Sequence, residues 1–212
     1  MCVCYFGEGA ASEGDFHAAL NFAATLKCQT IFICRNNGYA ISTPTRDQYQ
    51  GDGIVVRGVG YGMNSIRVEG NDLFAVYHAT REARRICVET QSPVLIEAMT
   101  YRAGHHSTSD DASRYREKDE LEYWQTKQNP VTRLRKYLVK RDLWDDQLEK
   151  REREQNKKQV LELVQELEHA PLTPFSELVT DVFDAVPEHL QVQKDWVQSI
   201  VEKYPEAYEK SH

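Results

Sequence analysis

Two short apolar runs, each ending at a polar turn, most constrain what this chain can fold into. Residues 2–6 form the first run and stop at a Gly-Glu-Gly turn, and residues 30–34 form the second and stop before an Asn-Asn pair. A stretch with helical spacing of its apolar residues, 12–26, lies between them. Strand, helix and strand in this order predict a parallel pair whose carboxyl ends lie at one edge of a sheet, where open α/β sheets bind ligands.

Oxygen-bearing and small residues at these two turns suit a magnesium–diphosphate ligand. Mg²⁺ prefers a compact shell of oxygens, and Glu8 offers a carboxylate while Asn37 offers a carboxamide oxygen. Gly9 and Ala10 are small enough for the backbone to lie against a phosphate, and the start of the following helix attracts anions. Arg35 is a further candidate for binding the phosphate charge. Each turn taken singly is more often an ordinary tight turn, but their occurrence at two successive strand ends favours a ligand site.

The alternation of strands and helices continues to residue 99. Residues 39–62 are rich in Gly, Pro, Thr and Asp and predict mostly loop, with a short helix opening near Ile54. Residues 65–68 predict a strand, 72–90 a helix that begins after a turn and cap, and 93–99 a buried strand. We therefore predict an α/β fold, with a parallel sheet flanked by helices and right-handed crossovers between its strands.

The remaining residues predict helices and no further chemistry. Helices are expected to begin near residues 119 and 130, followed by a long charged helix over 143–170 and a last helix over 189–204. We therefore divide the chain into an α/β core, residues 1–116, and a helical C-terminal extension of the same domain, residues 117–212.

Charge, hydropathy and cysteine content exclude some classes of function. The net charge of −7 disfavours binding to a nucleic-acid backbone, and the acidic excess of residues 141–212 indicates a solvated helical face. No apolar run approaches the length of a membrane span, and we expect neither nucleic acid nor membrane as a partner. The five cysteines lie mainly in apolar runs, which predicts reduced, mostly buried thiols in a reducing compartment.

A polar loop, residues 100–116, follows the last predicted strand. Long polar loops at strand ends often carry function. His105 and His106 could join Asp110 or Asp111 at a metal, but adjacent histidines do not easily face one ion. A Ser–His–Asp hydrolase is compatible with the composition, although the chain lacks a nucleophile elbow.

The two turns together resemble a known cofactor motif. Gly-Glu-Gly, followed one helix and one strand later by Asn-Asn, resembles the thiamine-diphosphate motif, which usually has Asp in place of Glu. The wider contexts GEGAASEGD and CRNNGYAISTP, with YRAGHHSTSDD in the polar loop, resemble the α subunits of branched-chain 2-oxoacid dehydrogenase E1 components. Related pyruvate enzymes have a single His and a Ser-Met-Ser-Asp run in this loop. The resemblance extends from Cys2 to about Lys210 and implies a thiamine-diphosphate-binding fold.

The resemblance assigns cofactor contacts to the two turns. It implies three ligands for Mg²⁺: Glu8, Asn37 and the backbone carbonyl of Tyr39. It also implies contacts to the diphosphate of thiamine diphosphate from Gly9, Ala10 and Arg35. The glutamate that contacts the aminopyrimidine ring would come from a β subunit.

The resemblance also assigns roles within the polar loop. His106 is expected to contact the cofactor and to handle protons during catalysis. Ser107 matches a regulatory phosphoserine, and Glu117 stands where the family has a second phosphosite, so second-site regulation should be absent. Three further residues are expected to stabilise the loop: Arg102, Asp110 and Tyr115.

The implied function is oxidative decarboxylation of branched-chain 2-oxoacids, with acyl transfer to the lipoyl group of an E2 component. The implied partners are an E1 β subunit in an α2β2 heterotetramer, the E2 lipoyl domain, and a regulatory kinase and phosphatase, all in the mitochondrial matrix. Such α subunits have a long region before the first strand, so we expect an N-terminally truncated form that lacks a transit peptide. The alternatives are a pyruvate- or acetoin-type E1 α subunit, or an inactive fragment that binds the β subunit or the kinase.

Overall fold

The computed structural model of the chain describes residues 1–171 and 173–208, and it contains two compact units. Unit 1 comprises Met1–Asp145 and unit 2 comprises Asp146–His212. All residues of the candidate site belong to unit 1. The division between residues 116 and 117 that the sequence suggested stays a prediction.

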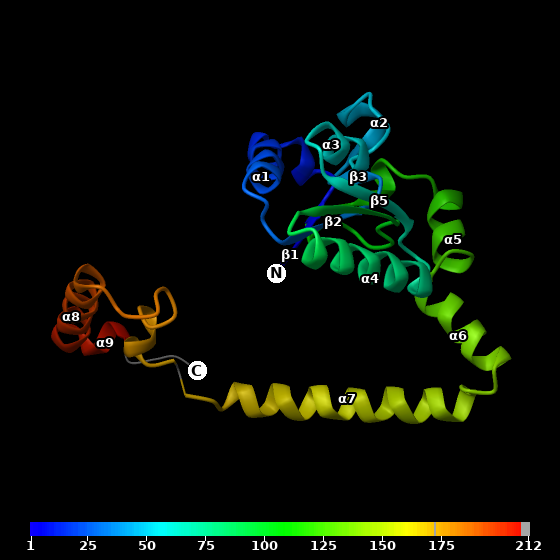
Figure 1. Cartoon of the computed structure of the whole chain (residues 1–212). Helices are drawn as coiled ribbons and strands as arrows, with labels where there is room; N and C mark the ends of the chain where they lie inside the picture. Colours follow the sequence, from blue (N-terminus) through cyan, green and yellow to red (C-terminus); the bar gives the residue numbers. More distant parts are fainter. Residues whose placement is uncertain (172, 209–212) are drawn as a thin grey trace. The chain divides into compact units, whose positions relative to one another are not determined.

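A four-stranded sheet forms the centre of unit 1 (Figure 1). Its strands are β1 (Cys2–Gly7), β2 (Thr30–Asn36), β5 (Asn64–Glu69) and β6 (Val94–Met99). They lie in the order β1-β2-β6-β5, and every neighbouring pair is parallel, which confirms the predicted parallel sheet. In this register Gly7 pairs with Arg35, and Asn36 pairs with Met99, so the carboxyl ends of β1, β2 and β6 meet at one edge.

Helices and a short hairpin complete the chain. The hairpin strands are β3 (Tyr39–Ala40) and β4 (Thr43–Pro44). The helices of unit 1 are η1 (Ala10–Ser12), α1 (Gly14–Thr25), α2 (Thr45–Gln48), α3 (Val55–Gly60), α4 (Leu73–Glu89), η2 (Ala112–Arg114), α5 (Lys118–Thr126) and α6 (Pro130–Lys140). Those of unit 2 are α7 (Asp146–Glu168), η3 (Phe175–Leu178), α8 (Glu188–Lys203) and α9 (Pro205–Tyr208).

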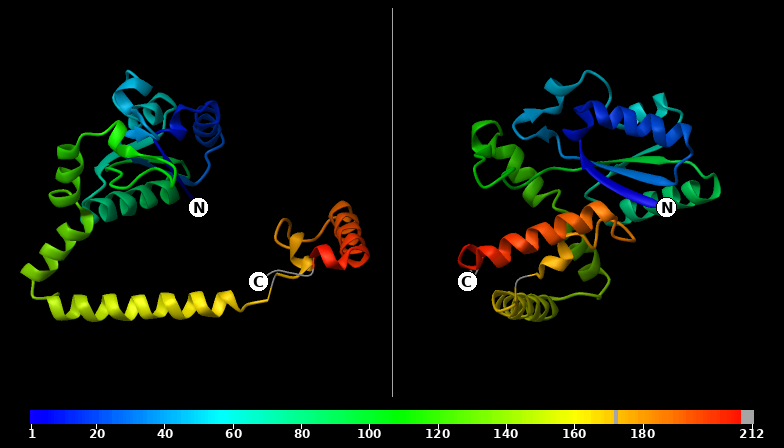
Figure 2. Two further views of the ribbon diagram at one scale, coloured as in Figure 1. Left: turned by 180° about the vertical axis from the view of Figure 1, so that it is seen from behind. Right: turned by 90° about the vertical axis from the view of Figure 1, so that its left-hand side faces the viewer.

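The sheet has an apolar cluster on each face, and helices cover both (Figures 1 and 2). Side chains alternate between the faces along each strand, so neighbours in sequence enter different clusters. On the face of α1 and α3 the cluster includes Leu20, Cys34 and Leu95. On the other face, under α4, it includes Ile31 and Ile96. Burial on both faces explains why β2 and β6 read as near-continuous apolar runs.

Two helices begin at the N-terminal capping residues that the sequence predicted. Asp72 Oδ1 accepts hydrogen bonds from the backbone N–H groups of Phe74 and Ala75, at 2.9 and 3.0 Å, and so caps α4. Asn129 Oδ1 accepts from Thr132 N at 3.0 Å, with Pro130 in the first turn of α6. Both predicted starts are confirmed.

Some details differ from the sequence-based expectation. β2 continues to Asn36 instead of ending at residue 34, because its last residues still pair with β1 and β6. The thiols of Cys2 and Cys4 are exposed instead of buried, since β1 is an edge strand that lacks a neighbour on its outer side among the described residues. All five cysteines are free.

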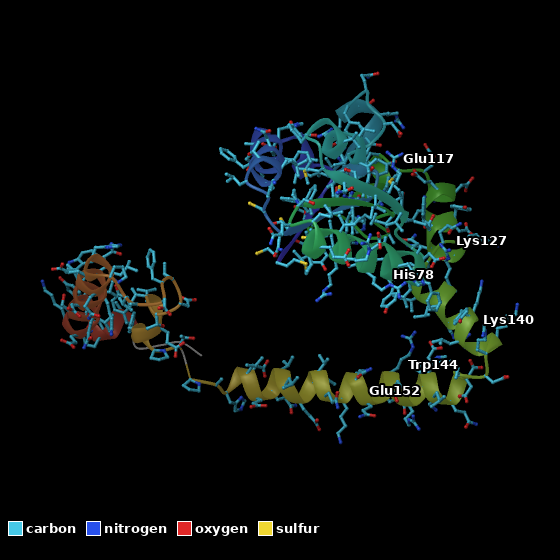
Figure 3. All side chains as sticks on the ribbon, viewed as in Figure 1. His78, Glu117, Lys127, Lys140, Trp144 and Glu152 are labelled. Carbon is cyan, nitrogen blue, oxygen red and sulfur yellow. The ribbon has the colours of Figure 1, made fainter. Side chains whose placement is uncertain are left out.

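Unit 2 consists mainly of polar helices. α7 buries none of its residues, and side chains project from it on several sides (Figure 3). Exposed apolar residues gather toward the end of α7, including Val160, Leu163 and Leu167. Within the described ranges, no helix of either unit is long and apolar enough to cross a membrane.

Candidate functional site

Glu8 directly follows β1, and Asn37 directly follows β2, so the parallel pairing of these strands brings the two side chains together. Glu8 Oε2 accepts a hydrogen bond from the Asn37 backbone N–H at 3.0 Å and another from Asn37 Nδ2 at 2.9 Å. Two other oxygens of this pair, Glu8 Oε1 and Asn37 Oδ1, are buried and have no hydrogen-bond partner among the described residues. Burial raises the pKa of Glu8, and the hydrogen bond from the Asn37 backbone only partly offsets that rise.

Unpartnered buried oxygens on two touching side chains require an explanation, because nearly all buried polar atoms in proteins are hydrogen-bonded. A bound cation is one explanation, since carboxylate and carboxamide oxygens are ligands that Mg²⁺ accepts. Among the described residues, no three His, Cys, Asp or Glu side chains gather as a metal site. A cation at the Glu8–Asn37 pair would therefore also use neutral oxygens, as the sequence suggested.

The third expected oxygen ligand, the Tyr39 carbonyl, lies just beyond a tight turn at Gly38. Gly38 has a φ of +86°, in the left-handed region that glycine adopts without strain, and its carbonyl accepts a hydrogen bond from Thr45 N at 2.9 Å. Among the residues that the structure describes, the Tyr39 carbonyl accepts one long hydrogen bond, 3.4 Å, from Arg102 Nη1. The Tyr39 hydroxyl donates to Glu120 Oε2 at 3.2 Å, which ties the turn to α5.

The small residues after Glu8 have a packing role in the structure. A β-carbon at Gly9 would lie 2.8 Å from the β-carbon of Ala40, so only glycine lets this turn pack against β3. Ala10 is exposed and opens η1. Their predicted contact with a diphosphate stays a prediction.

Two expected cofactor residues are not brought into contact with Glu8 or Asn37. Arg35 is exposed, and the alternation of β2 directs its side chain to the face opposite that of Cys34. The His106 imidazole is also exposed. Within the described part of the chain, neither side chain has a hydrogen bond or ion pair, so their roles stay predictions.

The polar loop is held by a chain of hydrogen bonds through the three residues expected to stabilise it. Arg102 Nη2 donates to the Tyr115 hydroxyl at 2.9 Å, and that hydroxyl donates to Asp110 Oδ2 at 2.7 Å. The same Asp110 oxygen accepts from the His106 backbone N–H at 2.8 Å. These last two bonds, the backbone one first, hold the pKa of Asp110 below its usual range. Arg102 Nη2 also donates to the Ile41 carbonyl at 2.6 Å, which anchors the loop to the hairpin.

Other loop residues make only local contacts. His105 Nδ1 accepts a hydrogen bond from Ala112 N at 3.0 Å. Ser107 is exposed, and its hydroxyl lies 3.2 Å from that of Ser109. The metal alternative for this loop gains no support, because the structure gathers no such ligand cluster at its described residues.

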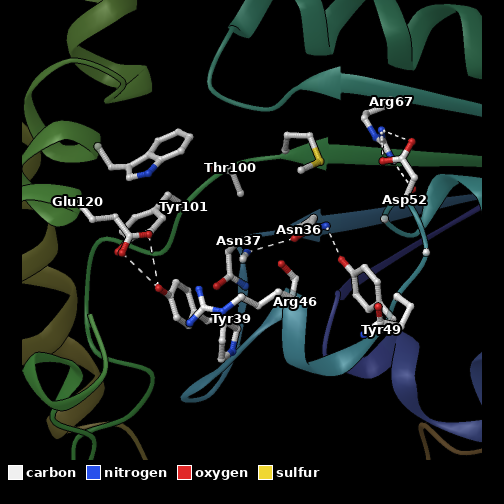
Figure 4. Close-up of a pocket in the computed structure, with 18 residues that line it drawn as sticks. Asn36, Asn37, Tyr39, Arg46, Tyr49, Asp52, Arg67, Thr100, Tyr101 and Glu120 are labelled. Atoms are coloured by element: carbon white, nitrogen blue, oxygen red, sulfur yellow. Dashed lines mark hydrogen bonds and ion pairs between the residues drawn. The ribbon is translucent and has the colours of Figure 1, made fainter. Parts of the chain in front are cut away.

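A cavity of about 630 Å³ opens at the carboxyl ends of these strands (Figure 4). Asn36, Asn37 and Tyr39 form one part of its wall, and the close-up shows the Tyr39 hydroxyl directed at Glu120. Trp124, stacked on Tyr101, also lines it. The cavity has the size of a small-molecule site and lies where open α/β sheets bind ligands.

Glu97 was missed by the sequence reasoning, and it is the most densely hydrogen-bonded carboxylate at this edge. Its Oε1 accepts from Asn36 Nδ2 at 2.8 Å and Ile54 N at 2.9 Å, and its Oε2 accepts from Val55 N at 3.0 Å and Arg67 Nε at 3.1 Å. Burial by itself would raise the pKa of Glu97, but these bonds, that from Asn36 foremost, hold it below its usual range. A single acidic residue in an otherwise apolar strand was the available signal.

Arg116 was also missed. It is 8% exposed, and it donates to the backbone carbonyls of Arg102 and Gly104, the latter at 2.8 Å. Its guanidinium lies 5.3 Å from the Tyr101 ring centroid and 5.7 Å from that of Tyr115. Arg116 thus fastens the base of the polar loop, and no sequence pattern indicated this.

The fold and the cavity together define an α/β protein with a candidate ligand site at the carboxyl ends of parallel strands. The family model of the dehydrogenase E1 component matches residues 1–176, and the chain belongs to this family. The resemblance found in the sequence is thereby confirmed.

Individual relatives match along the whole chain. It is 54% identical to the mitochondrial 2-oxoisovalerate dehydrogenase subunit alpha of Homo sapiens, over 100% of this chain and 48% of that protein. The protein of the same name from Caenorhabditis elegans is 53% identical over 98% of this chain and 48% of its own length. The mitochondrial 2-oxoisovalerate dehydrogenase subunit alpha 1 of Arabidopsis thaliana is 49% identical over 97% of this chain and 44% of its own length. The chain spans about half the length of the curated relatives it matches.

Proposed function

We propose that this chain forms part of the α subunit of a branched-chain 2-oxoacid dehydrogenase E1. The reaction is oxidative decarboxylation of a branched-chain 2-oxoacid, with transfer of the acyl group to the lipoyl arm of an E2 component. One observation carries the proposal: Glu8 and Asn37 are in hydrogen-bond contact, each has a buried oxygen without a partner among the described residues, and Asn37 lines a cavity of about 630 Å³. Relatives that are 54% and 53% identical to this chain are named 2-oxoisovalerate dehydrogenases, which supports a branched-chain 2-oxoacid as the substrate.

The proposed cofactor is Mg²⁺–thiamine diphosphate, which supplies an electron sink for the carbanion formed on decarboxylation. Glu8 Oε1, Asn37 Oδ1 and the Tyr39 carbonyl would hold Mg²⁺, because the two side-chain oxygens are unpartnered and the carbonyl has only one long hydrogen bond. Gly9 and Ala10 would hold the diphosphate through their backbone N–H groups. Arg35 would contribute its positive charge.

The polar loop would supply proton transfer. The His106 backbone is fixed by Asp110, while its imidazole is exposed and uncommitted among the described residues. The exposed imidazole of His106 would act on a bound substrate as a general acid or base. Arg102 and Tyr115 would keep this backbone segment in place.

The same loop suits regulation by phosphorylation at Ser107. Its hydroxyl is exposed, and a phosphate there would add nearly two negative charges three residues before Asp110. Repulsion would weaken the hydrogen bonds through which Asp110 holds the loop. The proposed partners are accordingly an E1 β subunit, the lipoyl domain of E2, and a kinase and phosphatase. The proposed location is the mitochondrial matrix, as the names of the relatives suggest.

We extend the proposal to the domain organisation. Residues 1–116 would be the cofactor-binding core and residues 117–212 a helical extension that contacts neighbouring subunits. The exposed apolar residues of α7 fit such a role.

The test combines cofactor binding with turnover. The 212-residue chain is titrated with Mg²⁺–thiamine diphosphate, alone and with an E1 β subunit, by calorimetry. Decarboxylation of 2-oxoisovalerate and of pyruvate is then measured for the reconstituted protein. We expect binding that Glu8→Ala abolishes and that the exposed control Glu13→Ala leaves unchanged, with 2-oxoisovalerate preferred.

Absence of binding in both conditions would refute the cofactor assignment. Binding with a preference for pyruvate would refute the branched-chain assignment in favour of the pyruvate-type alternative. Binding without turnover of either acid would favour the inactive-fragment alternative.

A further inference from the structure

Glu97 stands on β6 as the only acidic side chain of that strand, and it is fully buried. Each of its two carboxylate oxygens accepts two hydrogen bonds, so neither is left to bind a cation. Glu8, the other fully buried carboxylate at this edge, keeps one oxygen without a partner. The two carboxylates therefore have different roles. Glu8 has an oxygen available to bind a cation, whereas both oxygens of Glu97 are used to fix neighbouring residues.

The neighbour that connects Glu97 to the cation site is Asn36. Because a carboxylate only accepts hydrogen bonds, Glu97 requires that Asn36 point its Nδ2 toward β6, at 2.8 Å. The amide oxygen must then point the other way, and Asn36 Oδ1 accepts from Gly38 N at 3.1 Å. That bond closes the turn whose middle residue is Asn37.

We propose that Glu97 is a positioning residue of the cation site, acting through Asn36 to fix the turn that holds Asn37 against Glu8. The proposal rests on the proposed function only for the identity of the cation and cofactor. The positioning itself is a property of this chain. Residues that orient metal ligands in this way typically change metal affinity by about 10–100-fold when they are replaced.

The anchoring of Glu97 supports this role. Its partners Ile54 and Val55 donate through the backbone at the start of α3, so no side-chain rotation can release them. Arg67 adds an ion pair from β5 and is itself paired with Asp52. Three bonds from two elements, the start of α3 and β5, thus hold Glu97, and its fourth bond fixes the orientation of Asn36.

The test uses Glu97→Gln in the full 212-residue chain, with Val94→Ala as a matched control. Val94 is buried on the same strand but enters the apolar cluster under α4, so its replacement lowers stability without touching Asn36. Two quantities are measured. The first is the hydrogen-exchange rate of the Gly38 amide by NMR without cofactor, and the second is the Mg²⁺ concentration for half-maximal binding at fixed thiamine diphosphate.

We expect Glu97→Gln to speed Gly38 exchange at least tenfold and to raise the half-saturating Mg²⁺ concentration about 10–100-fold. Val94→Ala should change the Gly38 exchange rate and the half-saturating Mg²⁺ concentration by less than twofold each, when the two variants are compared under conditions where their unfolding midpoints are equal. If Glu97→Gln does not fold, Asn36→Asp serves instead. It keeps an oxygen for Gly38 N, removes the Nδ2 donor to Glu97 and to the Tyr49 hydroxyl, and sets a second carboxylate against Glu97, whose other three bonds remain.

The inference is overturned if Gly38 exchange stays within twofold of wild type, or if Val94→Ala changes it equally. A failure of the proposed function would look different. The wild-type chain would then bind no Mg²⁺–thiamine diphosphate, while the Gly38 exchange rates would still decide whether Glu97 positions the turn.

Discussion

Replacing Glu8 by glutamine should stabilise the cofactor-free chain while it removes cofactor binding. Glu8 is fully buried, and its Oε1 has no hydrogen-bond partner, whereas Oε2 is already hydrogen-bonded to Asn37. An unsatisfied buried polar atom costs about 1–3 kcal/mol, and more when it is charged. Glutamine keeps one oxygen for the hydrogen bonds from Asn37 and removes the charge from this buried position.

We expect a gain of about 2 kcal/mol for Glu8→Gln near pH 8, which for a chain of this size corresponds to about 4–8 °C in Tm. The assay is thermal and urea unfolding in a buffer with chelator. Glu13→Gln is the matched control, because Glu13 is exposed and its replacement should alter stability by less than about 0.5 kcal/mol. With Mg²⁺–thiamine diphosphate at 100 times Kd, wild type should gain about 2.7 kcal/mol and Glu8→Gln nothing, so the order of stability reverses.

The pH dependence follows from the raised pKa of Glu8. The unfolded chain loses this proton near pH 4.3, whereas the folded chain keeps it to a higher pH. The stability that Glu8 contributes is therefore fully present below the unfolded pKa and is lost as pH rises through the folded pKa. The advantage of Glu8→Gln should vanish in acid and grow toward neutral pH. A cofactor-free Glu8→Gln that is less stable than wild type at pH 8 would refute the reasoning, since Oε1 would then have a stabilising partner.

Three further changes test the surroundings of the site. Gly53→Ala should lower the free energy of unfolding in urea by about 1–3 kcal/mol, because the φ of Gly53 is +74° and a β-carbon there would meet the Arg67 guanidinium and the Glu97 carboxylate. Gly60→Ala is the control: a β-carbon at Gly60 would lie in open space, so this variant should be neutral or gain up to about 1 kcal/mol. Arg116→Lys should cost about 2 kcal/mol and speed proteolysis of residues 102–115, and an unchanged cleavage rate would contradict its role as the fastener of the loop. Ser107→Glu should speed hydrogen exchange across the same residues while Ser107→Ala does not, and equal rates in both variants would exclude the charge as the cause.

The contact between Glu8 and Asn37 in the candidate site could be predicted because it follows from local patterns and one topological rule. Apolar runs at 2–6 and 30–34, with a helix between them, predict a parallel pair, and parallel strands end at the same edge. That rule alone brings Glu8 next to Asn37, and the structure places them in hydrogen-bond contact. The N-terminal caps at Asp72 and Asn129 were likewise readable, since capping depends on residues only two or three positions apart.

Contacts that depend on strand order or on distant side chains could not be predicted. The sequence of an apolar strand does not indicate whether the strand is central or at an edge of the sheet. The exposure of Cys2 and Cys4 was therefore not predicted. Glu97 meets Asn36, 61 positions earlier, only because β6 lies beside β2. Arg116 binds backbone carbonyls, which carry no sequence signature.

The stacked pair at the cavity wall has a practical consequence. The rings of Trp124 and Tyr101 lie parallel, with 5.3 Å between their centroids and 1° between their planes. Of the three tryptophans, all within the described residues, only Trp124 lines this cavity. The chain therefore carries its own fluorophore at the mouth of the site, and a molecule that enters and disturbs the stack will change the indole emission, so occupancy can be followed optically without attaching a label.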